Sequence, residues 1–519
     1  MKHIAKTIKR TAMVAALLFA ATACEHNFDE MNTNTTALPT IDPVLLLNGA
    51  TLNASYTSGA SGGSGLIYDA SIVQQIVSPV LGLTSGGNFN KENRGASATL
   101  WQNYYPNVIR NTKAILEILD QDPTNTSRDN LRQMTRILQA YAFMVLTDEY
   151  GDIPYTQAGL GFIDQNFFPE YTPQPTIYTD LIKELTEASA ALNVSGRIET
   201  SDVLYKGDVA KWKKFGYSLL LRAGMRLSKV DRARAQTVAA AAFAGGVILT
   251  NADNAVIRHD ASNTNGFGNT LNSTEAANYY LAAPFVDYLQ DTNDPRLKAI
   301  AVRYVGAASG ADQGVGKPSA TTDPAQQVGM PIGASTTSAV VGGVGKYFAY
   351  SQVDRGRIAT QLSPLFLVTA AQCQLLLAEA RHENWITTGD EATYYNAGVR
   401  LHMEQMASYS AASAIAATDI DNYLLANPYV PADGLEMINT QYWIASFLNT
   451  PEAYANFRRS GFPALDPNPA TGQDISSGFI RRLQYPTSEV SVNATNLELA
   501  VTRMGGERMD TPVWWDGGK

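Results

Sequence analysis

A serine flanked by glycines is the first group in the sequence that could carry out chemistry. Residues 59 to 63 read Gly-Ala-Ser-Gly-Gly and satisfy the pattern G-x-S-x-G, in which Ser61 would be a nucleophile. A nucleophile of this kind follows a buried strand and opens a helix, whereas Ser61 lies in the run SGASGGSG with no apolar strand before it. We interpret the match as coincidental and keep a hydrolase using Ser61, or an unidentified carboxylate pair, as the alternative hypothesis.

The carboxylates of LTDEYGDIPY form the second candidate group. Asp148, Glu149 and Asp152 lie close together, but Asp and Gly before Ile-Pro are typical of a turn that ends a helix, and the spacing matches no twelve-residue calcium loop. His382 and His402 are expected to be polar residues on the surfaces of neighbouring helices. The sequence therefore predicts no catalytic residue, no metal site and no cofactor.

Aromatic rings beside amides are the third group, and their chemistry suits a sugar, whose C–H face packs on a ring while its hydroxyls take hydrogen bonds. In LWQNYYPNVIRNTKAILEIL, helical spacing puts Tyr104, Asn107 and Asn111 on a face that could contact a ligand. Pro106 cannot donate to a helix, so the helix could begin only there. The alternative is that these amides cap local backbone. The opposite face is expected to be core: Trp101, Tyr105, Val108, Thr112, Ile115 and Leu119.

A cysteine follows the amino-terminal apolar segment. The basic head of residues 2 to 10 and the apolar residues 12 to 21 are typical of an export signal. Ten helical residues rise about 15 Å, against about 30 Å of hydrocarbon, so the segment cannot remain as an anchor. The ending Ala-Thr-Ala-Cys resembles a lipobox, which predicts that Cys24 is acylated and begins the mature chain. An ordinary secreted protein cut near Ala23 is the alternative.

Composition limits the partners. The signal contains four of the 39 Lys and Arg and none of the 48 Asp and Glu, so the mature chain has a net charge of −13. Nucleic acid is excluded as a partner, because phosphate binding needs a basic surface. Cys373 has no internal disulfide partner and is expected to be a small buried helical residue.

Apolar spacing of three and four predicts a mainly helical protein. In residues 131 to 150 one buried stripe ends at Gly151, and a second helix through VAKWKKFGYSLLLRAGMRLSKVD is followed at once by a third, RARAQTVAAAAFAGG. Another pair is expected in SPLFLVTAAQCQLLLAEARHENW and DEATYYNAGVRLHMEQM, where Asp390 can cap the second helix. A further helical stretch is GLEMINTQYWIASFLNTPEAYANFRRSG.

Helix hairpins of this kind indicate a scaffold of repeats. Trp212, Phe215, Gly216 and Leu219 partly match the first helix of a tetratricopeptide repeat, without a strict 34-residue period. We predict a mainly α fold, a tetratricopeptide-like helix-hairpin scaffold, with long irregular insertions at roughly 53 to 99, 245 to 280 and 305 to 363. Aromatic anchors in or beside these glycine-rich insertions suggest recognition; they are Tyr68, Phe89, Tyr279, Tyr280, Tyr347 and Phe348.

Several long segments together resemble the SusD and RagB family of nutrient-binding outer-membrane lipoproteins, in its SusD-like 2 branch. The segments are LTDEYGDIPYTQA, GDVAKWKKFGYSLLLRAGMRLS, LSPLFLVTAAQCQLLLAEA, EAYANFRRSGFPAL, RRLQYPTSEVSVNATN and VWWD. The resemblance implies tetratricopeptide-like helix pairs, a lipid-anchored position on the outer membrane, and a partner TonB-dependent β-barrel transporter of the SusC type. It implies a bound nutrient, an oligosaccharide or a peptide, and we favour the oligosaccharide.

The resemblance also adds candidate ligand residues. Family members often contact ligands through the start of the helix near residue 100 and the preceding loop, which adds Asn88 and Phe89 to Tyr104. A second set lies in the insertions expected to rim the pocket: Asn278, Tyr279, Tyr280 and Arg355.

The expected organisation is a signal peptide at 1–23, a flexible tether at 24–40 and a single nutrient-binding domain at 41–519.

Overall fold

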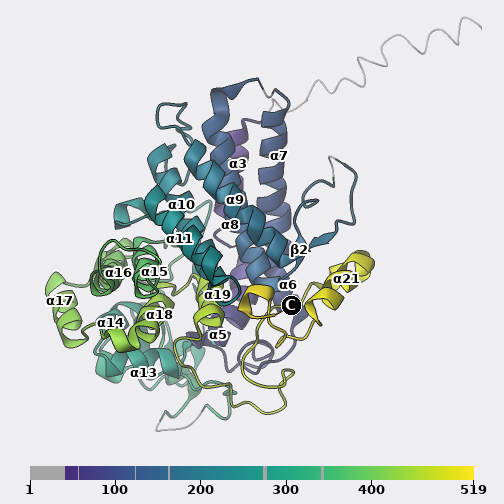
Figure 1. Ribbon diagram of the computed structural model, residues 1–519. Helices are drawn as coiled ribbons and strands as arrows, with labels where there is room; N and C mark the ends of the chain where they lie inside the picture. The colour runs from purple at the N-terminus through teal and green to yellow at the C-terminus, as the bar shows by residue number, and fades with distance from the viewer. Residues whose placement is uncertain are drawn as a thin grey trace, which may run out of the picture. The chain divides into compact units, whose positions relative to one another are not determined.

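A computed structural model of the chain describes residues 41–56, 58–122, 124–161, 164–272, 277–339 and 344–518. The signal peptide, Cys24 and the tether lie outside these described residues. Val44–Lys519 forms one compact unit, and its described part is mainly helical (Figure 1).

The α-helices of the described part are numbered in chain order. They are α3 (Pro43–Asn53), α4 (Ser58–Ala60), α5 (Ala70–Ile72), α6 (Arg94–Tyr104), α7 (Arg110–Asp120), α8 (Asp129–Tyr150), α9 (Gln174–Ala191), α10 (Val209–Arg226), α11 (Arg232–Gly245), α12 (Gly266–Asn272), α13 (Ala283–Asp291), α14 (Arg296–Ile300), α15 (Ala370–His382), α16 (Glu391–Gln405), α17 (Ala417–Ala426), α18 (Gly434–Ala445), α19 (Thr450–Ser460), α20 (Thr487–Val492) and α21 (Ala494–Met504).

Shorter helical turns of other types link these helices. Two are π-helical, η1 (Ser61–Asp69) and η2 (Tyr105–Ile109). The 3₁₀ turns are η3 (Thr126–Arg128), η4 (Leu227–Lys229), η5 (Asn251–Asp253), η7 (Gly310–Asp312), η8 (Pro324–Gln326), η9 (Tyr347–Ala349), η10 (Met406–Ser408), η11 (Ala411–Ser413), η12 (Pro431–Asp433) and η13 (Trp514–Asp516).

Short antiparallel strands pair across long sequence separations. Pairs form between β1 (Ile76–Val77) and β5 (Tyr280–Leu281), β2 (Ile153–Pro154) and β3 (Tyr171–Thr172), and β4 (Ala255–Ile257) and β9 (Leu365–Val368). A three-stranded sheet has the order β7 (Ala320–Thr321), β6 (Ala301–Tyr304), β8 (Gln352–Val353). In the described part these strands fasten loops to the helices, and the helices form the core.

The helix-hairpin scaffold is confirmed. In Figure 1, α9, α10 and α11 run side by side, and α8 packs on α9. The stripe predicted on α8 is buried from Leu131 to Tyr150, and the helix ends at Gly151 with φ 85°. Gly216 of α10 lets α9 approach, because a methyl group there would lie 2.1 Å from Ser189 Oγ. The repeat-like glycine therefore has a packing reason.

The insertion at 53 to 99 was expected to be irregular, and in part this is wrong. Residues 58 to 72 form one helical run through α4, η1 and α5, because the glycines of SGASGGSG allow close packing. A methyl group on Gly63 would lie 2.4 Å from Thr99 Oγ1 of α6. Composition alone suggests a loop, but contact with α6 favours a buried helix.

Two other local expectations are also wrong. Leu365–Val368 forms strand β9 rather than the start of a helix, and α15 begins only after Thr369, whose side chain caps it. The helix at residues 94 to 120 does not begin at Pro106. It continues through the π turn η2, a wider turn that accommodates the missing proline N–H.

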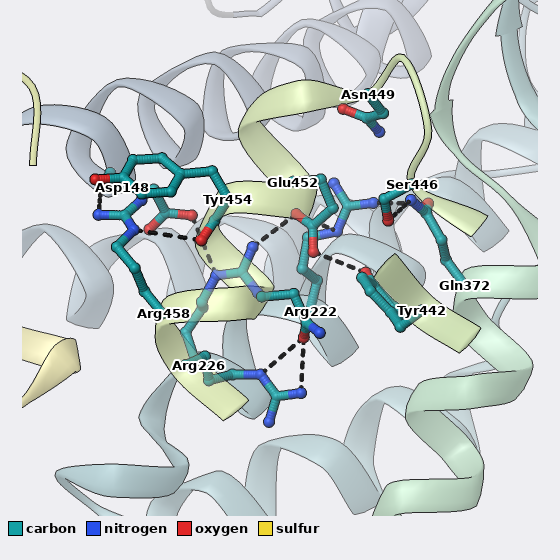
Figure 2. A network of polar contacts seen from close by, with 12 residues as sticks. Asp148, Arg222, Arg226, Gln372, Tyr442, Ser446, Asn449, Glu452, Tyr454 and Arg458 are labelled. Carbon is teal, nitrogen blue, oxygen red and sulfur yellow. Dashed lines mark hydrogen bonds and ion pairs between the residues drawn. The ribbon is translucent and has the colours of Figure 1, made fainter. Parts of the chain in front are cut away.

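A buried network of charges joins α8, α10, α18 and α19 (Figure 2). Glu452 of α19 binds Arg226 Nη2 at 2.6 Å and Arg222 Nε at 3.1 Å, both from α10. Arg226 Nε also lies 3.2 Å from Asp148 Oδ2 of α8, and Tyr442 of α18 donates to Glu452 Oε1 at 2.7 Å. Burial raises the pKa of Glu452, but the two guanidinium groups outweigh burial, and the pKa lies below its ordinary value.

A second buried acidic group lies close to this network. Asp69 of η1 accepts the Thr450 hydroxyl at 3.1 Å, and Glu149 of α8 has no hydrogen-bond partner for its carboxylate among the described residues. Burial raises the pKa of Asp69 to about 8, and burial together with the charge of Asp69 raises the pKa of Glu149. Both carboxyls therefore favour the protonated state in the folded protein.

We expect Glu452→Gln to lower the free energy of unfolding by about 3–5 kcal/mol, because it leaves two buried guanidinium groups with one carboxylate. Urea unfolding measures this. The matched control is Glu187→Gln, which breaks a half-exposed pair with Arg136 and should cost less than about 1 kcal/mol. Equal losses in the two variants would contradict the role assigned to the network.

We expect Asp69→Asn to flatten the dependence of stability on pH. The pKa of Asp69 rises from 3.8 to about 8 on folding, so the protein loses stability as pH increases across that window. Asparagine cannot ionise and can still accept the Thr450 hydroxyl, so the variant should gain stability relative to the parent towards pH 8. Thermal unfolding from acidic to alkaline pH measures this. Asp474→Asn, at an exposed carboxylate whose pKa is lowered, is the control and should not flatten the profile.

Candidate functional site

The first set of predicted ligand residues does not form one surface. Tyr104 is fully buried, donates its hydroxyl to Ala54 O at 3.1 Å and stacks on Tyr56 at 5.9 Å between ring centroids. Asn111 Nδ2 donates to Asn107 O at 2.8 Å, and Asn107 Nδ2 lies 3.3 Å from Asn103 Oδ1, so both amides bond along their own helix.

Asn88 and Phe89 lie elsewhere, in the loop before α6. Asn88 is 1% exposed, and its amide donates to Ser78 O at 2.7 Å and to Ala334 O at 3.1 Å. Its carbonyl accepts from Gly333 N at 3.3 Å. The side chain thus ties two loops together, while Phe89 is half-buried beside it.

The second predicted set is brought together. Arg355 Nη2 lies 3.4 Å from Gln352 Oε1, and Gln352 Nε2 donates to Tyr279 O at 3.2 Å. Gln352 thus links Arg355 to the backbone next to Tyr280, and burial raises the pKa of the Tyr280 phenol. Asn278 is adjacent and half-buried.

Two aromatic rings lie beside this set, and the sequence indicates them only as aromatic anchors of an insertion. Tyr347 and Phe348 of η9 have ring centroids 4.0 Å apart, and Tyr347 meets Tyr280 edge to face at 6.0 Å. Both rings are half-buried, with one part packed on the loops and the rest open to solvent. We call the following residues the loop cluster: Asn278, Tyr280, Gln313, Tyr347, Phe348 and Arg355.

Hydrogen bonds from outside the rings hold the loop cluster in place. Gln313 is not among the ligand residues predicted from the sequence. Its Nε2 donates to Phe348 O at 2.6 Å and lies 3.3 Å from the Tyr280 hydroxyl. From β6, Arg303 Nε donates to Ala349 O at 2.6 Å. The sheet β7-β6-β8 therefore positions the half-exposed rings of Tyr347 and Phe348. The role of Gln313 has no local signal in the sequence, because its partners are distant residues.

The loop cluster combines flat apolar surface with polar groups. Tyr347 and Phe348 present ring area, and Arg355 supplies guanidinium donors that have no carboxylate partner among the described residues. Such a surface can stack a sugar ring or an apolar side chain and fix its orientation by hydrogen bonds. It has the components of a binding site.

The alternative nucleophile lies in a different environment. Ser61 is fully buried in η1, and its Oγ is 3.1 Å from Thr270 Oγ1. The described histidines bond elsewhere: His259 to Ser363 and Ser55, His382 to Glu391, and His402 to Arg296. His402 was expected on a helix surface, and this is wrong, because its ring is buried against Arg296.

Similar solved structures support one family. A chitin-binding protein is 31% identical with a TM-score of 0.81, covering 92% of this chain and 100% of that chain. A SusD-like protein described as Bacteroidetes AC2a is 25% identical with a TM-score of 0.80 and the same coverage. A chitin-binding SusD homologue from Flavobacterium johnsoniae, 21% identical with a TM-score of 0.74 over 91% of this chain and 98% of that chain, shares the fold.

Curated protein sequences gave no match. None of the described helices is both long and apolar enough to cross a membrane. The SusD-like 2 family model, described as starch-binding and associating with the outer membrane, matches residues 34–486. Because that match covers most of the sequence, the chain belongs to the SusD-like 2 family.

Proposed function

We propose that this chain is a non-catalytic lipoprotein on the outer face of the outer membrane, which binds an oligosaccharide and delivers it to a TonB-dependent β-barrel transporter of the SusC type. The loop cluster carries the proposal, because it combines half-exposed rings and a guanidinium group on loops fastened to the scaffold. The family's association with the outer membrane supports the location.

Chitin-type oligosaccharides are the favoured ligand, because two similar structures are described as chitin-binding. The two rings of Tyr347 and Phe348 pack on each other, and the pair would present its open ring surface to the C–H face of a sugar ring. Arg355 and Asn278 would bind hydroxyl or acetamido oxygens. A peptide could use the same rings, so both ligand classes belong in the test. Affinity should be modest, because a ligand passed onward must also be released.

The hydrolase alternative has less support. Its serine is buried in a helix, so a substrate could not reach Ser61 Oγ without opening η1. The loop cluster instead offers half-exposed rings, which suit capture. We therefore propose binding without turnover.

We expect Tyr347→Ala and Phe348→Ala each to weaken binding of chito-oligosaccharides about tenfold, because each removes one stacking ring. Isothermal titration against panels of glycans and peptides measures this. Tyr394→Ala, which removes a half-buried ring from α16, is the control and should bind like the parent. A parent protein that binds nothing in either panel would refute capture, and unchanged binding in both ring variants would refute this site.

We expect labelled palmitate to enter the protein in a Gram-negative host and to be absent from Cys24→Ala, because the acyl chain would be attached at that thiol. Cys373→Ala is the matched control and should retain the label, since burial raises the pKa of the Cys373 thiol to about 11 and keeps it unreactive. Labelling that persists in Cys24→Ala would place the lipid elsewhere, and an unlabelled parent would refute the anchor.

A further inference from the structure

A basic groove of about 450 Å³ lies where segments 203–211 and 251–258 meet. Its lining includes Lys206, Lys211 and Arg258 and no carboxylate, although the whole chain has a net charge of −9. Lys211 Nζ donates to Ala252 O at 2.7 Å. Lys206 and Arg258 are exposed, and neither has an ion-pair partner among the described residues. Two cations are therefore available to an anion from outside.

The four carboxylates nearest along the chain are bound elsewhere. Asp202 accepts from Trp212 Nε1 at 2.7 Å, and Asp253 pairs with Lys214 Nζ at 2.8 Å. Asp208 caps α10 by accepting from Lys211 N at 3.1 Å. Asp260 accepts from Ser262 N and Asn263 N, each at 2.8 Å. None of these four carboxylates forms an ion pair with Lys206, Lys211 or Arg258 among the described residues.

One exposed apolar side chain, Val203, lines the groove, and a second lies on the helix that is fastened to it. Asn48 of α3 donates to Ser201 O at 2.7 Å and accepts from Val203 N at 3.1 Å, which fastens one edge of the groove to α3. Leu45, one helical turn before Asn48, is 54% exposed, and Val203 is 41% exposed. Cations next to protruding apolar groups are the combination that binds at a lipid–water interface.

The same face is close in sequence to the lipid proposed above. About 19 residues separate Cys24 from the start of α3 at Pro43, and such a segment spans at most about 65 Å when extended. Of the described helices, α3 is the nearest along the chain to the acylated cysteine. This step rests on the proposed function, whereas the groove and its charges do not.

We propose that Leu45, Val203, Lys206, Lys211 and Arg258 form a face that docks on a bilayer with anionic phosphate headgroups. The cations lie against phosphates while Leu45 and Val203 enter the interface. Each Lys or Arg at such a surface changes partitioning about fivefold. Anionic headgroups repel the rest of the chain, which has a net negative charge, so the protein docks through this face.

The test uses the full chain with Cys24→Ala, so that no acyl chain contributes. Co-sedimentation is measured with vesicles of phosphatidylcholine and phosphatidylglycerol in equal parts and with phosphatidylcholine alone. Binding to the anionic vesicles only is expected, and it should weaken as salt increases. When Lys206→Gln and Arg258→Gln are introduced into the Cys24→Ala chain, partitioning onto the anionic vesicles should fall about 25-fold. The matched control is Lys298→Gln with Lys317→Gln, two exposed lysines outside the groove, and should bind like the parent.

Three outcomes would overturn the docking face: no binding of the Cys24→Ala chain to anionic vesicles, equal losses in both double variants, or full displacement by inorganic phosphate at constant ionic strength. The last would assign the groove to a free anion. Circular-dichroism melting of both double variants checks that they fold. Because this assay needs neither the acyl chain nor a glycan, its failure would leave the proposed capture and anchoring intact, and their failure would leave docking intact.

Discussion

Charges removed from water hold the helices of this protein in one arrangement. Glu452 and Asp148 meet Arg222 and Arg226 where α8, α10 and α19 converge. Separating any of these helices would leave a buried charge without its partner, a cost of several kcal/mol. The network does not need to add much net stability to have this effect, since its main consequence is to exclude alternative packings. Three distant parts of the chain thereby acquire one relative position.

That constraint extends towards the loop cluster. Arg222 Nη2 donates to Leu367 O of β9 at 3.1 Å, and β9 directly follows the segment that contains Tyr347, Phe348 and Arg355. β6 fixes the other side of the same segment through Arg303 and Ala349 O. The half-exposed rings of Tyr347 and Phe348 therefore extend from loops whose ends are fixed to the core. Rigid placement lowers the entropy lost when a ligand binds, which matters for a site with only a few contacts.

The sequence predicted what depends on local pattern and failed where distant partners decide. The stripe on α8 and the Asp390 cap of α16 follow from spacing and side-chain type, and both are present. SGASGGSG resembles a loop by composition, yet it is helical because α6 packs against Gly63. Leu365–Val368 carries a helix-compatible apolar run, yet pairing with β4 makes it a strand.

The residues of the candidate site show the same difference between features set by local pattern and features set by distant partners. Helical spacing placed Tyr104 on a face that could contact a ligand, whereas its side chain is buried and donates to Ala54 O, a partner 50 residues away in the sequence. Tyr279 and Arg355 were grouped from their positions in insertions, and in the structure Gln352 bonds to both. Gln313 could not have been found, because its role exists only once three loops meet.

The buried charge network and the loop cluster differ in their exposure to water. The charges of the Glu452 network are removed from water and bind one another in the core. The groups that face solvent in the loop cluster are half-exposed rings and a guanidinium, which can select a shape but do not surround a reacting atom. The strongest electrostatic interactions of the buried network therefore hold the scaffold together, and the half-exposed aromatic surface of the loop cluster is left to face solvent, where the proposed capture would take place.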